Sequence, residues 1–164
     1  MIDQPTFDRL LPAACEWAKA QEEFILARGT PLGPRHVTDA QRVGVRDTAR
    51  VRVLVVDRIP FPENEELAEA ARQTQIITVA SRGVTMGHGI IIRADAWGDR
   101  EVVLHQLVHV AQCERGGGLE SFVQEYLFNR HQCEKFSAGS LEEEARRVAH
   151  EICAADAAMK PANG

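Results

Sequence analysis

Two histidines within an almost wholly aliphatic segment place the strongest constraint on how this chain folds. The segment runs from Val102 to Val110 and contains His105 and His109. Its composition predicts a helix that is buried nearly all round. Residues four apart on a helix project from one face, one turn apart, at the separation that a single zinc ion needs. Because buried imidazoles need partners, the segment predicts either a metal site or two hydrogen-bonded core histidines.

The remaining pattern predicts a single α+β domain over residues 1–164. A helical segment is expected over 1–45. A core over 50–160 is expected to pack a small sheet, of three strands or slightly more, on the histidine-bearing helix. Apolar periodicity and capping residues predict helices over 6–27, 38–43, 63–73, 99–115, 119–129 and 140–159. Alternating or branched apolar residues predict strands over 50–59, 76–80 and 85–93, with one helical crossover among them.

The composition argues against several classes of protein. A net charge of −5 is unlike that of a dedicated nucleic-acid binder. No apolar run approaches the ~20 residues of a membrane span, and no basic and apolar leader begins the sequence. No C-x-x-C pair occurs among the cysteines, which are expected to be reduced thiols: Cys15, Cys113, Cys133 and Cys153. These features predict a cytoplasmic protein that binds neither membranes nor nucleic acid.

The histidine helix and its continuation resemble a known family. The sequence reads HQLVHVAQ over 105–112, then three glycines over 116–118, then FVQEYL over 122–127. This resembles the zincin metallopeptidases, and most closely short bacterial members with a helix of the type HELVHVxQ, a Gly-Gly turn and an aromatic-rich helix. The resemblance covers about Val51 to Ala149. It implies a zincin-like core, one bound Zn²⁺ and hydrolysis of peptide bonds by metal-activated water.

The sequence departs from the family at the motif's second residue, where Gln106 stands in place of glutamate. In the family that glutamate is the general base for the zinc-bound water, and an amide cannot take up a proton at neutral pH. Loss of a positioned general base typically costs 10²–10⁴-fold in rate. The resemblance therefore implies a zinc peptidase that is inactive or strongly impaired as written. An engineered Glu→Gln replacement and a natural pseudopeptidase that serves as a zinc-containing binding or regulatory module are both open.

The third metal ligand is expected on the last long helix. Glu143 suits a capping box with Ser140, whereas Glu142 and Glu144 flank the apolar face of that helix. The resemblance implies a ligand in an E-x-x-A pattern, which favours Glu142 and leaves Glu144 as the second choice. An acid often follows that alanine in the family and supports the first histidine, but Arg146 occupies the position here.

Other side chains near the motif have weaker claims. His88 and His131 are alternative ligands, and Cys113 lies about 12 Å along the helix axis from His105, too far to share its ion. Gln112 lies one turn beyond His109, where it can be either a partner of that imidazole or a surface residue. Tyr126 is typical of a core aromatic and could also donate to an oxyanion. The expected partner is a peptide or protein, which could pair with the strand over 87–93 along the cleft.

Overall fold

The computed structural model describes residues 2–132 and 140–160. Its helices are α1 (Gln4–Arg28), α2 (Pro34–Arg42), α3 (Glu65–Gln73), α4 (Arg100–Arg115), α5 (Leu119–Gln132) and α6 (Leu141–Met159). Its strands are β1 (Thr30–Pro31), β2 (Arg52–Val56), β3 (Gly83–Met86) and β4 (Gly89–Arg93), and the 3-10 turn η1 (Ala94–Ala96) follows β4. The predicted α+β class is confirmed. Within the described ranges, no helix is both long enough and apolar enough to cross a bilayer.

The strands form one mixed sheet in the order β1-β2-β4-β3. β2 and β4 are parallel, and α3 lies in the connection between them, as expected for a crossover. β1 and β3 pair antiparallel with the outer sides of this parallel pair. β4 is therefore an inner strand, and β3 is an edge strand.

Two strand predictions are wrong. Residues 76–80 form turns rather than a strand, because Gln75 adopts a φ of 55° and Thr78 N donates to Ser81 Oγ at 2.9 Å. Ile77 is nevertheless buried in the core, which accounts for the apolar run in the sequence. The predicted strand over 85–93 is two strands, because Gly87 adopts a φ of 62° and reverses the chain between β3 and β4.

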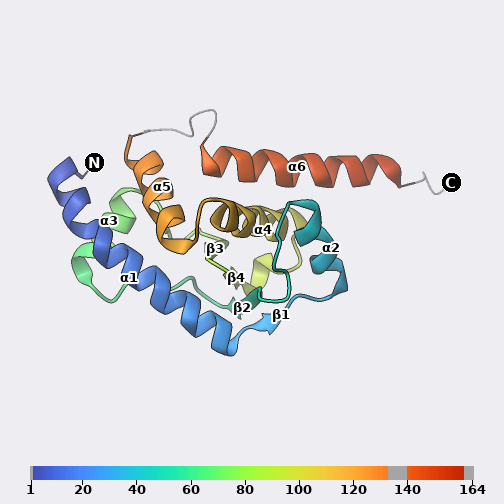
Figure 1. Cartoon of the computed structure of the whole chain (residues 1–164), viewed down its shortest axis with the longest axis horizontal. Coiled ribbons are helices and arrows are strands. Elements are labelled where there is room, and N and C mark those ends of the chain that lie inside the picture. Colours follow the sequence, from blue (N-terminus) through green and yellow to red (C-terminus); the bar gives the residue numbers. More distant parts are fainter. Residues whose placement is uncertain (1, 133–139, 161–164) are drawn as a thin grey trace.

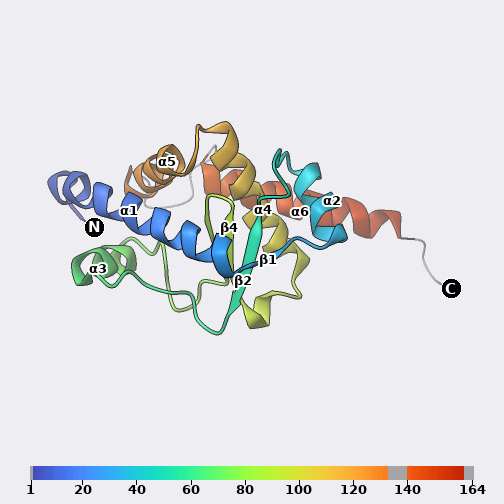
Figure 2. The same cartoon turned by 60° about the horizontal axis from the view of Figure 1, so that its bottom comes forward.

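The sheet lies between α4 on one face and α1 on the other (Figure 2). Branched residues of alternate register point to opposite faces of a strand, so each face has its own apolar cluster. The cluster on the α4 face includes Val53, Ile90, Ile92, Val103, Leu107 and Val110. The cluster on the α1 face includes Ala18, Ile25, Leu54, Met86, Ile91 and Phe122.

Charged side chains link α6 to α4 and α2. α6 runs alongside α4 and extends past it toward the C-terminus (Figure 1). The buried Asp39 of α2 accepts two hydrogen bonds from Arg100 of α4, at 2.9 and 2.6 Å. Arg100 also pairs with Asp156 of α6 at 2.7 Å, and Arg42 pairs with the same carboxylate at 2.8 Å. This network sets the position of α6, and hence of Glu142, relative to the histidine helix.

Candidate metal centre

His105 and His109 lie one turn apart on α4, which begins at a well-formed cap. The carboxylate of Asp99 accepts from the backbone N–H groups of Glu101 and Val102, as the sequence predicts. The imidazole Nε2 atoms of the two histidines are 3.1 Å apart. Their rings meet edge to face with centroids 4.7 Å apart. The helix thus directs both side chains to one point.

Glu142 in the first turn of α6 completes the group. Its Oε1 lies 2.9 Å from His105 Nε2, and its Oε2 lies 3.3 Å from His109 Nε2. The hydroxyl of Tyr126 on α5 donates to Glu142 Oε2 at 3.0 Å. Ser140 Oγ caps α6 by accepting from Glu143 N, as predicted, which aims the first turn of this helix at α4. Three separate helices therefore meet at the Glu142 carboxylate.

The hydrogen bonds of Gln112 orient the imidazole of His109. Gln112 Nε2 donates to the carbonyl oxygen of Leu141 at 2.8 Å and to Glu144 Oε2 at 2.9 Å, and both of these atoms are acceptors. The amide oxygen of Gln112 must then be the atom that lies 2.7 Å from His109 Nδ1. His109 therefore donates from Nδ1, which leaves Nε2 as the ring atom that faces His105 and Glu142.

The Nε2 atoms of His105 and His109 and the carboxylate of Glu142 converge on one point. The carboxylate of Glu142 cannot donate, so a proton or a cation has to lie among the three side chains. Ligand atoms about 2.1 Å from a tetrahedral zinc ion lie about 3.4 Å apart. The separations of 2.9, 3.1 and 3.3 Å among His105, His109 and Glu142 approach that spacing. One ligand atom from each residue lies within 4.8 Å of the other two, so the group could hold a metal ion. Two imidazoles and a carboxylate are a donor set that suits zinc.

Burial and charge keep the ligands in the states that a metal needs. Burial alone would raise the pKa of the Glu142 carboxyl, but hydrogen bonds with His105 and His109 outweigh it and hold that pKa well below 4.5. The carboxylate is thus ionised at neutral pH, as a metal ligand must be. The side chain of His109 is 6% exposed, whereas those of His105 and Glu142 are each 20% exposed. The group is therefore closed on the His109 side and open on the other.

Gln106 lies beside the group and contacts the edge strand. Its amide oxygen accepts from Thr85 Oγ1 at 2.9 Å, and its backbone carbonyl accepts from the same hydroxyl at 3.1 Å. A Cβ on Gly83 would come within 3.0 Å of the Gln106 amide carbon, so the glycine leaves room for this side chain. Gln106 is buried, and its oxygen already has a donor.

A cavity of about 720 Å³ opens from this group. His105, Gln106, His109 and Glu142 form one end of it. β3, the connection 74–77 and three helices form most of the rest, with Leu10 and Trp17 from α1, Ala70 from α3 and Phe122 from α5. Arg82 and the start of α4 also contribute to the lining. The strand along this cavity is β3 rather than the predicted 87–93, because β4 is paired on both sides and has no free edge.

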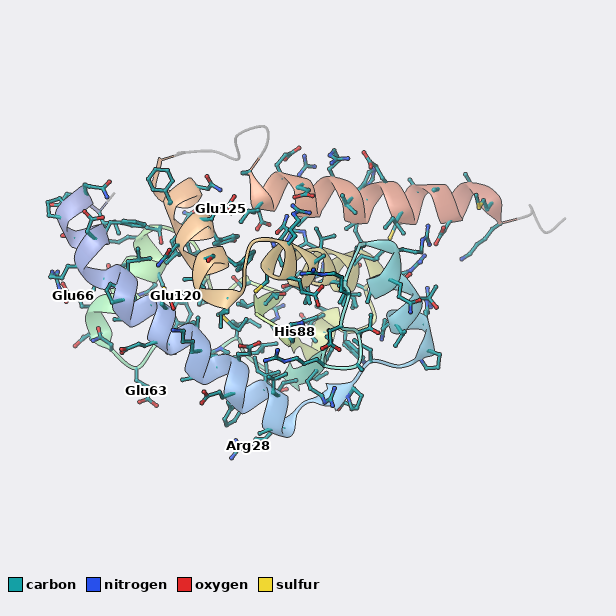
Figure 3. The ribbon with its side chains drawn as sticks, in the orientation of Figure 1. Arg28, Glu63, Glu66, His88, Glu120 and Glu125 are labelled. Atoms are coloured by element: carbon teal, nitrogen blue, oxygen red, sulfur yellow. The ribbon has the colours of Figure 1, made fainter. Side chains whose placement is uncertain are left out.

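The other predicted candidates lie away from the group. Glu144 pairs with Arg115 and accepts from Gln112, so it contacts His109 only through that amide. Cys113 is buried in the apolar core, where burial raises the pKa of its thiol to about 12. His88 lies on the turn between β3 and β4, with Glu114 2.9 Å from its Nε2 (Figure 3). The side chain of His131 lies outside the described residues.

Distant segments supply partners whose roles the sequence did not predict. Thr85, which was not a candidate, donates to Gln106, whereas Tyr126 and Glu144, which were candidates for other roles, bond to Glu142 and Gln112. Thr85 carried the one usable signal, since it is a polar residue in a strand that is otherwise apolar. Arg146, at the position where the family often has an acid, pairs instead with the neighbouring Glu143 on the surface.

The thiols also bear on the choice of ligands. Within the described ranges Cys15, Cys113 and Cys153 are free, and Cys133 lies outside those ranges.

Comparison with known proteins adds no further candidate: no protein family, curated protein or solved structure matches this chain.

Proposed function

We propose that this chain is a zinc-binding, peptidase-type domain of zincin-like architecture, with His105, His109 and Glu142 as its metal ligands. The observation that carries the proposal is the convergence of His105 Nε2, His109 Nε2 and the Glu142 carboxylate, with the His109 ring held by Gln112. These three residues would hold a zinc ion, and the side chains of His105 and Glu142 are open to the cavity from which water or substrate would reach it. The nearby edge strand supports a peptide as the substrate, because such edges pair with extended chains.

The residues of the chain divide the remaining tasks. Bound zinc would supply Lewis acidity and lower the pKa of a water molecule. Gln112 and Tyr126 hold His109 and Glu142 in position through hydrogen bonds of 2.7 and 3.0 Å. Gln106 occupies the place where a general base is needed, and its amide takes no proton from water. We therefore expect the chain as it stands to hydrolyse peptide bonds very slowly or not at all.

A specific observation also favours a second function, that of a zinc-containing binding or regulatory module. The amide of Gln106 is packed against Gly83 and bonded to Thr85, so its surroundings suit an uncharged side chain. A carboxylate at the same place would keep the bond from Thr85 but would be buried with its charge. The two functions share the metal site and differ in whether this domain turns over the peptide that it binds.

Restoring the glutamate separates the two functions. Zinc-loaded Gln106→Glu is expected to cleave a broad peptide library at least 10²-fold faster than the unchanged chain. Gln124→Glu, which adds the same charge at an exposed position of α5, is the matched control and should change nothing. Cleavage products are identified by mass spectrometry. Absence of cleavage by a folded, zinc-loaded Gln106→Glu variant would remove the peptidase interpretation and leave the binding module.

Metal content tests what both functions share. Protein purified without a histidine tag should contain one equivalent of zinc by elemental analysis, and His105→Ala should lose it. A content far below one equivalent that His105→Ala leaves unchanged would overturn both functions. His150→Ala is the control, because His150 is an exposed histidine on α6 that lies away from the ligands.

A further inference from the structure

His105, His109 and Glu142 are called the metal group below. The cavity beside them is largely apolar, which metal binding does not require. Its lining changes from polar at the His105 end to almost wholly apolar where α1, α3 and α5 meet. The apolar part is formed by side chains including Leu10, Trp17, Leu67, Ile77, Phe122 and Leu127. Its volume of about 720 Å³ exceeds what one side chain fills and is typical of sites that enclose a whole ligand.

The edge strand offers hydrogen-bonding groups at the cavity. Arg93 N donates to Arg82 O at 2.9 Å, which makes 82 and 93 a hydrogen-bonded pair of the antiparallel ladder. Since such pairs alternate, Val84 also bonds to β4, whereas the backbone groups of Gly83 and Thr85 point away from it. Within the described part of the chain these outward groups have no hydrogen-bond partner. A peptide added as a strand would pair with both.

The two faces of β3 differ in chemistry. Thr85 bonds to Gln106, and a Cβ on Gly83 would also meet Gln106, so this face of the strand meets α4 and the metal group. Val84 and Met86 belong instead to the apolar cluster on the α1 face. Residues opposite each other on neighbouring strands place their side chains on the same face. Peptide residues opposite Val84 and Met86 would therefore enter the apolar part of the cavity, and the residue between them would lie on the metal face.

Charge around the cavity bears on the kind of apolar ligand. The charged residues that line the cavity are Arg82, Asp99, Glu101 and Glu142. Arg82 pairs with Asp99 at 3.0 Å, so the lining carries an acidic surplus. This surplus disfavours fatty acids and other apolar anions, and it suits a neutral or basic peptide.

From these observations we infer that the cleft selects extended peptides with large apolar side chains at alternate positions, i and i+2. This selection rests on the proposed function in that it names the substrate class of the same site. The backbone of Gly83 and Thr85 would bind the main chain, and the apolar end of the cavity would bind both side chains. The residue between them would face the metal group.

Two peptides of identical composition test the spacing. The first is acetyl-Ala-Leu-Ser-Leu-Ser-amide, with leucines at alternate positions, and the second is acetyl-Ala-Leu-Leu-Ser-Ser-amide, with adjacent leucines. Trp17 lines the cavity and reports binding by its fluorescence once Trp97, which lies outside the cavity, is replaced in a Trp97→Phe background. Because the second leucine of the adjacent pair cannot enter the apolar end, the first peptide should bind about tenfold more tightly.

A pair of substitutions on α1 tests the location. Ala14→Phe fills the cavity and should abolish the difference between the peptides, whereas Ala20→Phe on the exposed side of α1 should preserve it. Circular dichroism shows whether each variant is folded. Equal affinity for the two peptides, or selection that survives in a folded Ala14→Phe variant, would overturn the inference. Tighter binding of decanoate than of the first peptide would overturn it as well.

Repeating the titration with EDTA and with zinc distinguishes this inference from the proposed function. Selection between the peptides that persists in EDTA, in a chain that takes up no zinc, supports the cleft inference while the zinc proposal fails. Zinc uptake with equal affinity for the two peptides overturns the cleft inference while the zinc proposal stands. Selection with zinc present supports both.

Discussion

One histidine that the metal group does not use is held between two carboxylates. His88 Nε2 lies 2.9 Å from Glu114, and its backbone N–H donates to Glu22 at 2.9 Å. The preceding Gly87 has a φ of 62°, and a Cβ there would come within 2.1 Å of the Glu22 carboxylate. The contacts of His88 with Glu22 of α1 and Glu114 of α4 therefore connect the turn between β3 and β4 to both helices.

This contact predicts a dependence of stability on pH. Hydrogen bonds with Glu22 and then Glu114 raise the pKa of His88 above 6.5, against the opposing effects of burial and Arg50. The stability that protonated His88 contributes is therefore fully present below pH 6.5 and is lost as the pH rises through the higher pKa of the folded state. Thermal melts from pH 6 to pH 9 should show this loss, and His88→Gln should reduce it.

The two carboxylates impose the opposite limit at low pH. Burial would raise the pKa values of Glu22 and Glu114, but hydrogen bonds from His88, and from backbone N–H groups, lower both below 4.5. Their contribution is present above pH 4.5 and is lost as the pH falls further. His150→Gln on exposed α6 is the control for His88. An unchanged pH profile in His88→Gln would contradict this account.

At the scale of helices and strands, the metal group depends on how α6 packs on α4. Glu142 belongs to α6, whereas His105 and His109 belong to α4, so the distances among the ligands follow the packing of these two helices. Leu141, Ala145 and Ala149 are the buried residues of α6, and the small alanines allow a close approach. At the far end the approach is fixed by charged groups rather than by apolar contact.

Replacing Arg100 with methionine should loosen that approach. The change leaves the carboxylate of Asp39, whose side chain is 2% exposed, buried without its partner. Such a loss costs about 3 kcal/mol in the free energy of unfolding. Urea denaturation measures it, and Arg147→Met removes an exposed ion pair on α6 as the control, worth under about 0.5 kcal/mol. Equal losses in the two variants would refute a structural role for Arg100.

Sequence patterns predicted the elements unevenly, for identifiable reasons. Helices with strong caps and long periodic patterns were predicted to within a few residues, as α4 and α6 show with Asp99 and Ser140. The predicted strand over 76–80 was wrong because a short apolar run can be buried without pairing, as Ile77 is. The sheet order and the bonds of Thr85 come from distant segments, which no local pattern encodes.

At the scale of the whole molecule, a bound metal would connect parts that are far apart in sequence. In the sequence, α5 and residues 133–139 lie between His109 and Glu142. One bound ion would therefore join α4 to the start of α6. The helical spacing of the histidines and the choice of Glu142 over Glu144 followed from the sequence and the resemblance. The large cavity did not, because its walls come from α1, α3 and α5 together.

Zinc should therefore stabilise the whole domain. Free zinc at 100 times its dissociation constant adds about 2.7 kcal/mol to the free energy of unfolding. For a chain of this size that corresponds to a rise of roughly 5–10 °C in Tm. Differential scanning calorimetry with zinc and then with excess EDTA measures the rise and its reversal. The double variant His105→Ala/His109→Ala is the control, and a shift of equal size in that variant would contradict binding at this group.

The cavity walls and the metal group are carried by different stretches of the chain. Trp17, Leu10 and Ala70 come from α1 and α3, whereas the candidate metal ligands come from α4 and α6. Substitutions can accumulate on the α1 and α3 walls without replacing a candidate ligand. Proteins descended from this one could therefore change the peptides that they recognise while they keep the candidate metal ligands. They could equally change those ligands while they keep the cavity.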